Sequence, residues 1–78
     1  MMPSPGEIMQ REMVHRGFSR WYLARVMKIP VRTVRGLMAG ATRVTPEIAA
    51  KLGVAFGTSS ALWEGLERSY REHTTTAD

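Results

Sequence analysis

Helix start and stop signals recur along the whole chain and divide its 78 residues into five short segments. Ser or Thr followed by Pro begins two of the segments, and glycine follows three of them. Within the segments, apolar residues recur every three or four positions, which is typical of an amphipathic helix. No segment alternates like a strand over more than a few residues. The sequence therefore predicts an all-α fold, a compact bundle of five helices covering residues 5–16, 19–27, 31–39, 45–56 and 59–71.

The length and composition indicate a single small domain. The chain has no cysteine, which excludes disulfide scaffolds, zinc fingers and thiol nucleophiles. It has no apolar run long enough for a transmembrane helix, and its start does not resemble a signal peptide. We expect one domain over residues 4–72, a disordered Thr-rich tail over residues 73–78, and a bacterial cytoplasmic protein associated with the nucleoid.

Positive charge is concentrated in one part of the chain. Residues 11–43 hold eight Arg and Lys residues against one acid, Glu12, whereas residues 44–78 hold three cations against five acids. Nine of the eleven cations are Arg, whose planar guanidinium suits phosphates and guanine edges. This distribution favours a nucleic-acid partner, the alternative being a solvated basic face.

The spacing between the second and third expected helices is that of a helix-turn-helix, because only residues 28–30 separate them. Counted from Arg20 as position one, position five is the small Ala24, which permits a close helix crossing. Positions fifteen and eighteen are the apolar Val34 and Leu37, which anchor the third helix. Position nine is Lys28, where a left-handed backbone favours glycine and costs another residue roughly 1–2 kcal/mol.

The chain resembles the XRE (Cro/C1-type) helix-turn-helix family over about residues 4–71, and within it the short HigA-type antitoxin branch. The resemblance is carried by Pro5-Gly6-Glu7-Ile8, Gly17-Phe18-Ser19, Leu23-Ala24-Arg25, Gly40, Thr45-Pro46-Glu47-Ile48-Ala49, Leu52, Phe56-Gly57-Thr58-Ser59, Trp63, Leu66 and Tyr70. It implies a lambda repressor-like DNA-binding domain that dimerises on palindromic operators, with a HigB-type ribonuclease toxin as a further partner. Arg20 and Lys28 depart from the usual Gln and Gly of the family.

In this architecture the third helix enters the major groove of double-stranded DNA. The residues predicted to read base edges are Val31, Arg32, Thr33 and Arg35. Those predicted to contact phosphates are Arg20, Tyr22, Lys28, Thr42 and Arg43. Trp21 has two interpretations, since its ring either flanks the DNA backbone or covers a neighbouring helix.

The last expected helix carries a large apolar stripe, namely Leu62, Trp63, Leu66 and Tyr70. An apolar surface left exposed marks an interface, so we predict that this stripe forms a homodimer. Packing of the whole stripe into the core is the alternative. Gly65 weakens this helix and is predicted to allow close approach of a second copy.

No catalytic, cofactor or metal site is expected. His15 and His73 have no carboxylate partners at metal-binding spacing, and the serines lie at helix starts. The leading hypothesis is a dimeric, sequence-specific repressor that controls its own gene as the antitoxin of a HigBA-type module. The alternative is an interaction module that mainly neutralises a toxin ribonuclease. The operator, the toxin and the signal that relieves repression do not follow from the sequence.

Overall fold

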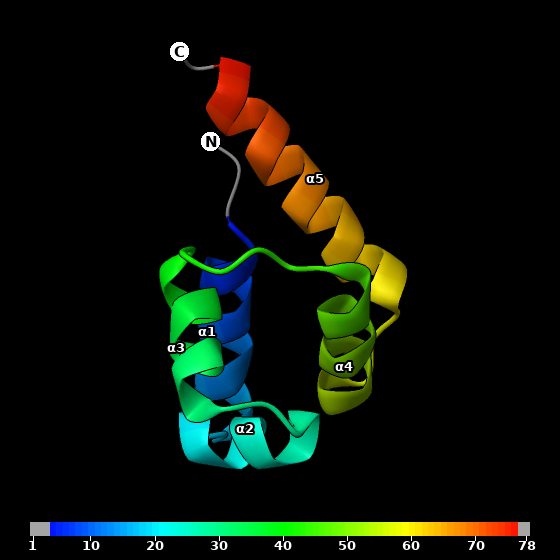
Figure 1. Cartoon of the computed structure of the whole chain (residues 1–78). Helices are drawn as coiled ribbons and strands as arrows, with labels where there is room; N and C mark the ends of the chain where they lie inside the picture. Colours follow the sequence, from blue (N-terminus) through cyan, green and yellow to red (C-terminus); the bar gives the residue numbers. More distant parts are fainter. Residues whose placement is uncertain (1–3, 77–78) are drawn as a thin grey trace.

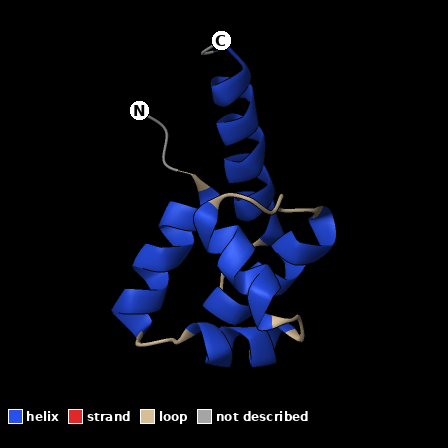
Figure 2. Ribbon diagram, turned by 60° about the vertical axis from the view of Figure 1, so that its left-hand side comes forward, coloured by secondary structure: helices blue, strands red, loops and turns tan. Residues whose placement is uncertain are grey.

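The computed structural model describes residues 4–76, and the side chains of residues 4–72. Every regular element in this range is an α-helix, so the predicted all-α class is confirmed (Figure 2). The five helices are α1 (Pro5–Arg16), α2 (Arg20–Met27), α3 (Val31–Ala39), α4 (Pro46–Phe56) and α5 (Ser60–Thr76).

Local capping explains the starts of α1, α2 and α4, each of which lies within one residue of its predicted position. Ser4, Ser19 and Thr45 each accept a hydrogen bond from the backbone N–H three residues later. Such caps contribute about 1 kcal/mol each. Glu7 Oε1 accepts a hydrogen bond from the Ser4 backbone N–H, which completes a capping box. The glycines that close α1, α3 and α4 are left-handed, namely Gly17, Gly40 and Gly57.

All five helices contribute to one core. In Figure 1, α1 and α3 lie side by side, α4 stands opposite them, and α2 crosses beneath. Helix α5 packs along α4 and extends beyond the other four helices. The core is formed by apolar side chains from all five helices and from Val44 in the α3–α4 loop; among the largest that are fully buried are Trp63, Phe56, Met9, Leu23, Met27, Leu52 and Val34.

The start of α1 approaches the end of α3 at backbone distance. A Cβ on Gly6 would lie 2.5 Å from the carbonyl oxygen of Leu37 and 2.6 Å from that of Met38. Since these neighbours are backbone atoms, no side-chain rotation makes room for one. Gly6 is therefore required for the packing that holds the end of α3.

Helix α5 is longer than the sequence predicts. The expected end at about Arg71 is wrong, because the helix continues through Thr76 and includes the first four residues of the predicted disordered tail. No glycine or proline follows Gly65, so no local signal stops the helix. The Glu67–Arg71 ion pair, one turn apart, also favours helix here. Residues 77–78 of the predicted tail lie outside the described range.

Candidate nucleic-acid interface

Helices α2 and α3 pack as a helix-turn-helix. Ala24 is buried at their contact, and Val34 and Leu37 are buried on the inner side of α3. The three positions that the spacing predicts to be buried are therefore confirmed. Because Val34 and Leu37 are buried, the opposite side of α3 faces solvent.

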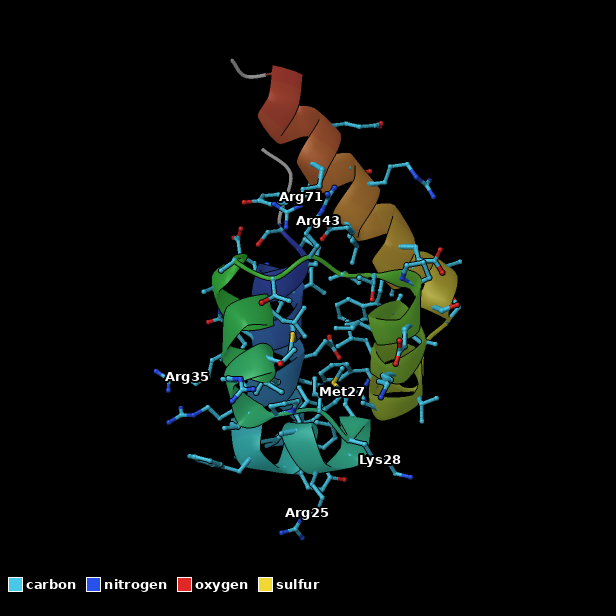
Figure 3. The ribbon with its side chains drawn as sticks, in the orientation of Figure 1. Arg25, Met27, Lys28, Arg35, Arg43 and Arg71 are labelled. Carbon is cyan, nitrogen blue, oxygen red and sulfur yellow. The ribbon has the colours of Figure 1, made fainter. Side chains whose placement is uncertain are left out.

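The turn is held in a strained conformation. Lys28 has φ 58° and ψ 47°, and it is the one non-glycine residue with positive φ in the described part of the chain. The adjacent Met27 carbonyl accepts a hydrogen bond from Lys51 Nζ of α4 at 3.1 Å. This bond ties the end of α2 to α4, and the Lys28 side chain projects into solvent (Figure 3).

The outward side of α3 carries two arginines. Arg32 and Arg35 are exposed, and Arg35 points away from the domain (Figure 3). Thr33 is half-buried, and Val31 is partly buried against the core, which leaves less of its side chain for a base. No acidic residue occurs between Glu12 and Glu47, so this side of α3 has no competing carboxylate from its own segment.

Exposed aromatic and basic side chains surround the start of α2. Arg20 and Tyr22 are exposed, and the Arg20 guanidinium lies 5.4 Å from the centre of the Trp21 ring. Trp21 is 62% exposed, so the interpretation that it covers a neighbouring helix accounts for little of its ring. Trp21 lines a groove together with Val14 and Met38.

The two remaining phosphate candidates lie in the loop between α3 and α4. Thr42 packs against Gly36 of α3, and its N–H donates to the Gly36 carbonyl at 3.1 Å. The Arg43 side chain is 74% exposed. Figure 3 shows Arg43 at the opposite end of α3 from Lys28. The predicted phosphate contacts thus flank α3 at both ends instead of forming one cluster.

Sequence reasoning overlooked Glu67, the buried acid beside this loop. Its side chain is 11% exposed, and Oε1 accepts a hydrogen bond from the Val44 N–H at 3.2 Å. Its Oε2 pairs with Arg71 and lies 3.8 Å from Arg43 Nε. One signal was available, since Glu67 comes one turn after Trp63 and shares the inner side of the last helix.

The apolar stripe of α5 divides between the core and the surface. Trp63 is 1% exposed, its ring centre lies 5.6 Å from that of Phe56, and its Nε1 donates to Thr58 Oγ1 at 2.8 Å. Trp63 is therefore a core residue, as in the alternative interpretation, and its predicted place in a dimer contact is corrected. Leu62 is 45% exposed, and Leu66 and Tyr70 are half-buried.

The space around Gly65 is open, since a Cβ there would meet nothing within 4 Å.

The side chains described here include no group of three His, Cys, Asp or Glu residues placed to bind a metal ion. Within residues 4–76, none of the helices has the length and apolar character needed to cross a membrane.

A tightly packed helix pair, a short turn and an exposed, arginine-bearing second helix define a helix-turn-helix protein of the DNA-binding class. No protein-family model matches the chain. Over 68 residues it is 35% identical to the uncharacterized HTH-type transcriptional regulator YddM of Escherichia coli (strain K12), an alignment covering 87% of this chain and 72% of that protein. The chain belongs to the family of HTH-type transcriptional regulators, which are not enzymes.

Solved structures agree with the predicted resemblance to HigA. The Pseudomonas aeruginosa antitoxin HigA with the higBA promoter superposes with a TM-score of 0.93 at 29% identity, covering 99% of this chain and 85% of that one. An addiction module antidote protein of the HigA family from Coxiella burnetii superposes with a TM-score of 0.83 at 33% identity, covering 91% and 79%. The five-helix fold and the similarity to HigA antitoxins are thereby confirmed.

Proposed function

We propose that this protein is a transcriptional repressor that binds the operator of its own gene, and that it is the antitoxin of a HigBA-type module. The observation that carries the proposal is the division of α3 into two sides. Val34 and Leu37 are buried on one side, and Arg32 and Arg35 are exposed on the other. The P. aeruginosa HigA, which shares this fold, was determined with its promoter.

In the proposed complex α3 lies in the major groove of the operator. Arg32 and Arg35, three residues apart, reach base edges from the same side of the helix. A guanidinium that binds O6 and N7 of guanine contributes about 1–3 kcal/mol of discrimination. Thr33 and the exposed part of Val31 complete the base-reading set.

Phosphate contacts on both sides of α3 fix its register without reading sequence. Arg20 and Tyr22 approach the backbone from the start of α2, and Lys28 approaches it from the turn. Thr42 and Arg43 do so from the loop beyond the other end of α3. Bound over a promoter, the protein represses by excluding RNA polymerase.

We further propose that two copies bind a palindromic operator. One domain of this size reads a half-site, and a two-fold dimer reads two half-sites about one helical turn apart. Leu62, Leu66 and Tyr70 of α5 are the proposed contact, because they retain exposed surface after the core is formed. The buried Trp63 supports this contact indirectly, because it packs α5 against the core.

The second proposed role is binding of a HigB-type ribonuclease toxin. The similarity to two HigA proteins favours it. The proposed toxin contact is a folded surface, because the described part of the chain is helical as far as Thr76. We place both activities in the bacterial cytoplasm, with the DNA-bound form on the nucleoid.

A reporter gene under the protein's own promoter tests the proposed function in cells. We expect repression by the parent protein and its loss in Arg32→Ala and Arg35→Ala. Arg11→Ala, which removes an exposed arginine from α1 and leaves α3 unchanged, is the matched control. Equal reporter output with and without the parent protein would refute autoregulation. For the second role, a genomically adjacent small ribonuclease should be toxic alone and harmless when co-expressed.

A further inference from the structure

We propose that Glu67 of α5 is the positioning residue of the α3–α4 loop, and that it places Arg43 for its contact with a DNA phosphate. This inference depends on the proposed DNA binding, and it extends the interface to a helix that carries none of the proposed DNA contacts. It is based on the backbone hydrogen bonds of Thr42 and Val44, the residues on each side of Arg43.

The loop is attached on both sides of Arg43. Before it, the Thr42 N–H donates to the Gly36 carbonyl of α3 at 3.1 Å. After it, the Val44 N–H donates to Glu67 Oε1 at 3.2 Å, and Val44 itself is buried. The Arg43 backbone is therefore fixed between α3 and α5, while its side chain extends into solvent.

The Glu67 carboxylate forms a close ion pair with one arginine and a longer one with the other. Arg71, one turn further along α5, forms a close pair with Oε2. Arg43 Nε lies 3.8 Å from the same oxygen, near the limit of an ion pair, and the Arg43 side chain is 74% exposed. An exposed pair at this distance is weak. The Arg43 guanidinium can therefore leave Glu67 and pair with a DNA phosphate, while the hydrogen bond from the Val44 N–H to Glu67 remains in place.

Glu67 is thus suited to hold the backbone of the α3–α4 loop while leaving the Arg43 side chain free to bind a phosphate. The consequence is a physical connection between α5 and the DNA-facing loop. Any change in the packing of α5 that moves Glu67 also moves Arg43 relative to α3.

Three substitutions separate the positioning role from simple charge. Glu67→Gln keeps an oxygen that can accept the Val44 N–H and removes the charge. Glu67→Asp keeps the charge and shortens the reach to Val44. Glu67→Ala removes both. Each variant is first checked for intact helix content and cooperative melting, and the Asp and Gln variants keep the test decisive if the Ala variant does not fold.

The first readout is hydrogen exchange of the Val44 amide, which needs no DNA. We expect it to be protected in the parent protein and in Glu67→Gln, and to exchange faster in Glu67→Asp and Glu67→Ala. The second readout is the slope of log Kobs against log salt for one duplex. Loss of a single phosphate contact should reduce its magnitude by about 0.9 in the Asp and Ala variants. Glu67→Gln should retain the parent slope.

A cycle with Arg43→Ala completes the test. Arg43→Ala alone should reduce the slope by the same amount, and adding Glu67→Asp should reduce it no further. Unchanged Val44 exchange in the Asp and Ala variants would overturn the inference, as would a second, independent loss of slope in the double variant. A parent protein that binds no duplex would instead refute the proposed function and, with it, the role of Arg43 at DNA.

Discussion

The backbone of α1 touches the end of α3 at Gly6, where an added Cβ would lie 2.5 Å from the carbonyl oxygen of Leu37. This contact fixes the helix that carries Arg32 and Arg35. We expect Gly6→Ala to force α1 and α3 apart and to destabilise the domain by about 1–3 kcal/mol, the usual cost of overpacking. For a chain of this size, each kcal/mol lowers Tm by about 4–8 °C. Thermal unfolding followed by circular dichroism measures the effect.

Gly65→Ala is the matched control, because the same substitution in α5 enters open space. It should raise stability by up to about 1 kcal/mol through helix propensity. A lower Tm for this variant at high protein concentration, but not at low concentration, would show that a second copy occupies that space. An unchanged Tm for Gly6→Ala would contradict the close packing of α1 on α3.

Lys28 combines backbone strain with a proposed phosphate contact, and two substitutions separate them. Lys28→Gly should stabilise the domain, since a left-handed non-glycine residue costs roughly 1–2 kcal/mol. Lys28→Ala keeps the left-handed residue and should give no such gain. Both remove the charge, so both should reduce the salt slope of DNA binding by about 0.9. Melting and salt-dependent binding of the three proteins check these expectations, and equal stability of the Gly and Ala variants would contradict the strain.

Trp63 and Leu62 are neighbours in sequence with different surroundings. Trp63→Ala should destabilise the domain by about 3–5 kcal/mol, because it removes a buried ring from the core. Leu62→Ser changes an exposed side chain and should leave the monomer's stability nearly unchanged while weakening self-association. Denaturant unfolding and analytical ultracentrifugation measure the two effects. Self-association of the Leu62 variant equal to that of the parent would remove this part of α5 from the proposed dimer contact.

Arg32→Ala should weaken operator binding and relax specificity at one base pair, at a cost of about 1–3 kcal/mol for that pair. Arg35→Ala should do the same at a different base pair. Binding to a set of operators with single base-pair changes measures both. Arg11→Ala is the control for loss of a positive charge outside α3, and it should leave the relative affinities of the duplexes unchanged. A uniform loss in Arg32→Ala would mean that Arg32 contacts phosphate and does not read a base.

The sequence predicts the boundaries of the first four helices because their signals are local. Ser4, Ser19 and Thr45 act on the backbone three residues away, and a glycine ends three of these four helices directly. The helix-turn-helix follows from spacing for the same reason, and the left-handed conformation expected at Lys28 is present. The end of α5 carries no such signal, and the sequence places it too early.

Relationships between distant residues were not predictable in the same way. Glu67 and Val44 are 23 positions apart, and no pattern in either segment indicates that they meet. The periodicity of α5 places Trp63 on an apolar stripe, but it does not distinguish the side of that stripe which faces Phe56 from the side which faces solvent. The base-reading and phosphate roles are predicted from the position of each residue around α3, and the substitutions above test them.

The measurement that tests the central claim most directly is fluorescence anisotropy with the duplex upstream of the protein's own gene and a scrambled duplex of equal composition, each at two salt concentrations. We predict at least about 1000-fold tighter binding to the native duplex, within the range of specific regulators. Equal affinity for both duplexes, with the same steep salt dependence, would show phosphate neutralisation alone and would contradict sequence-specific repression through α3.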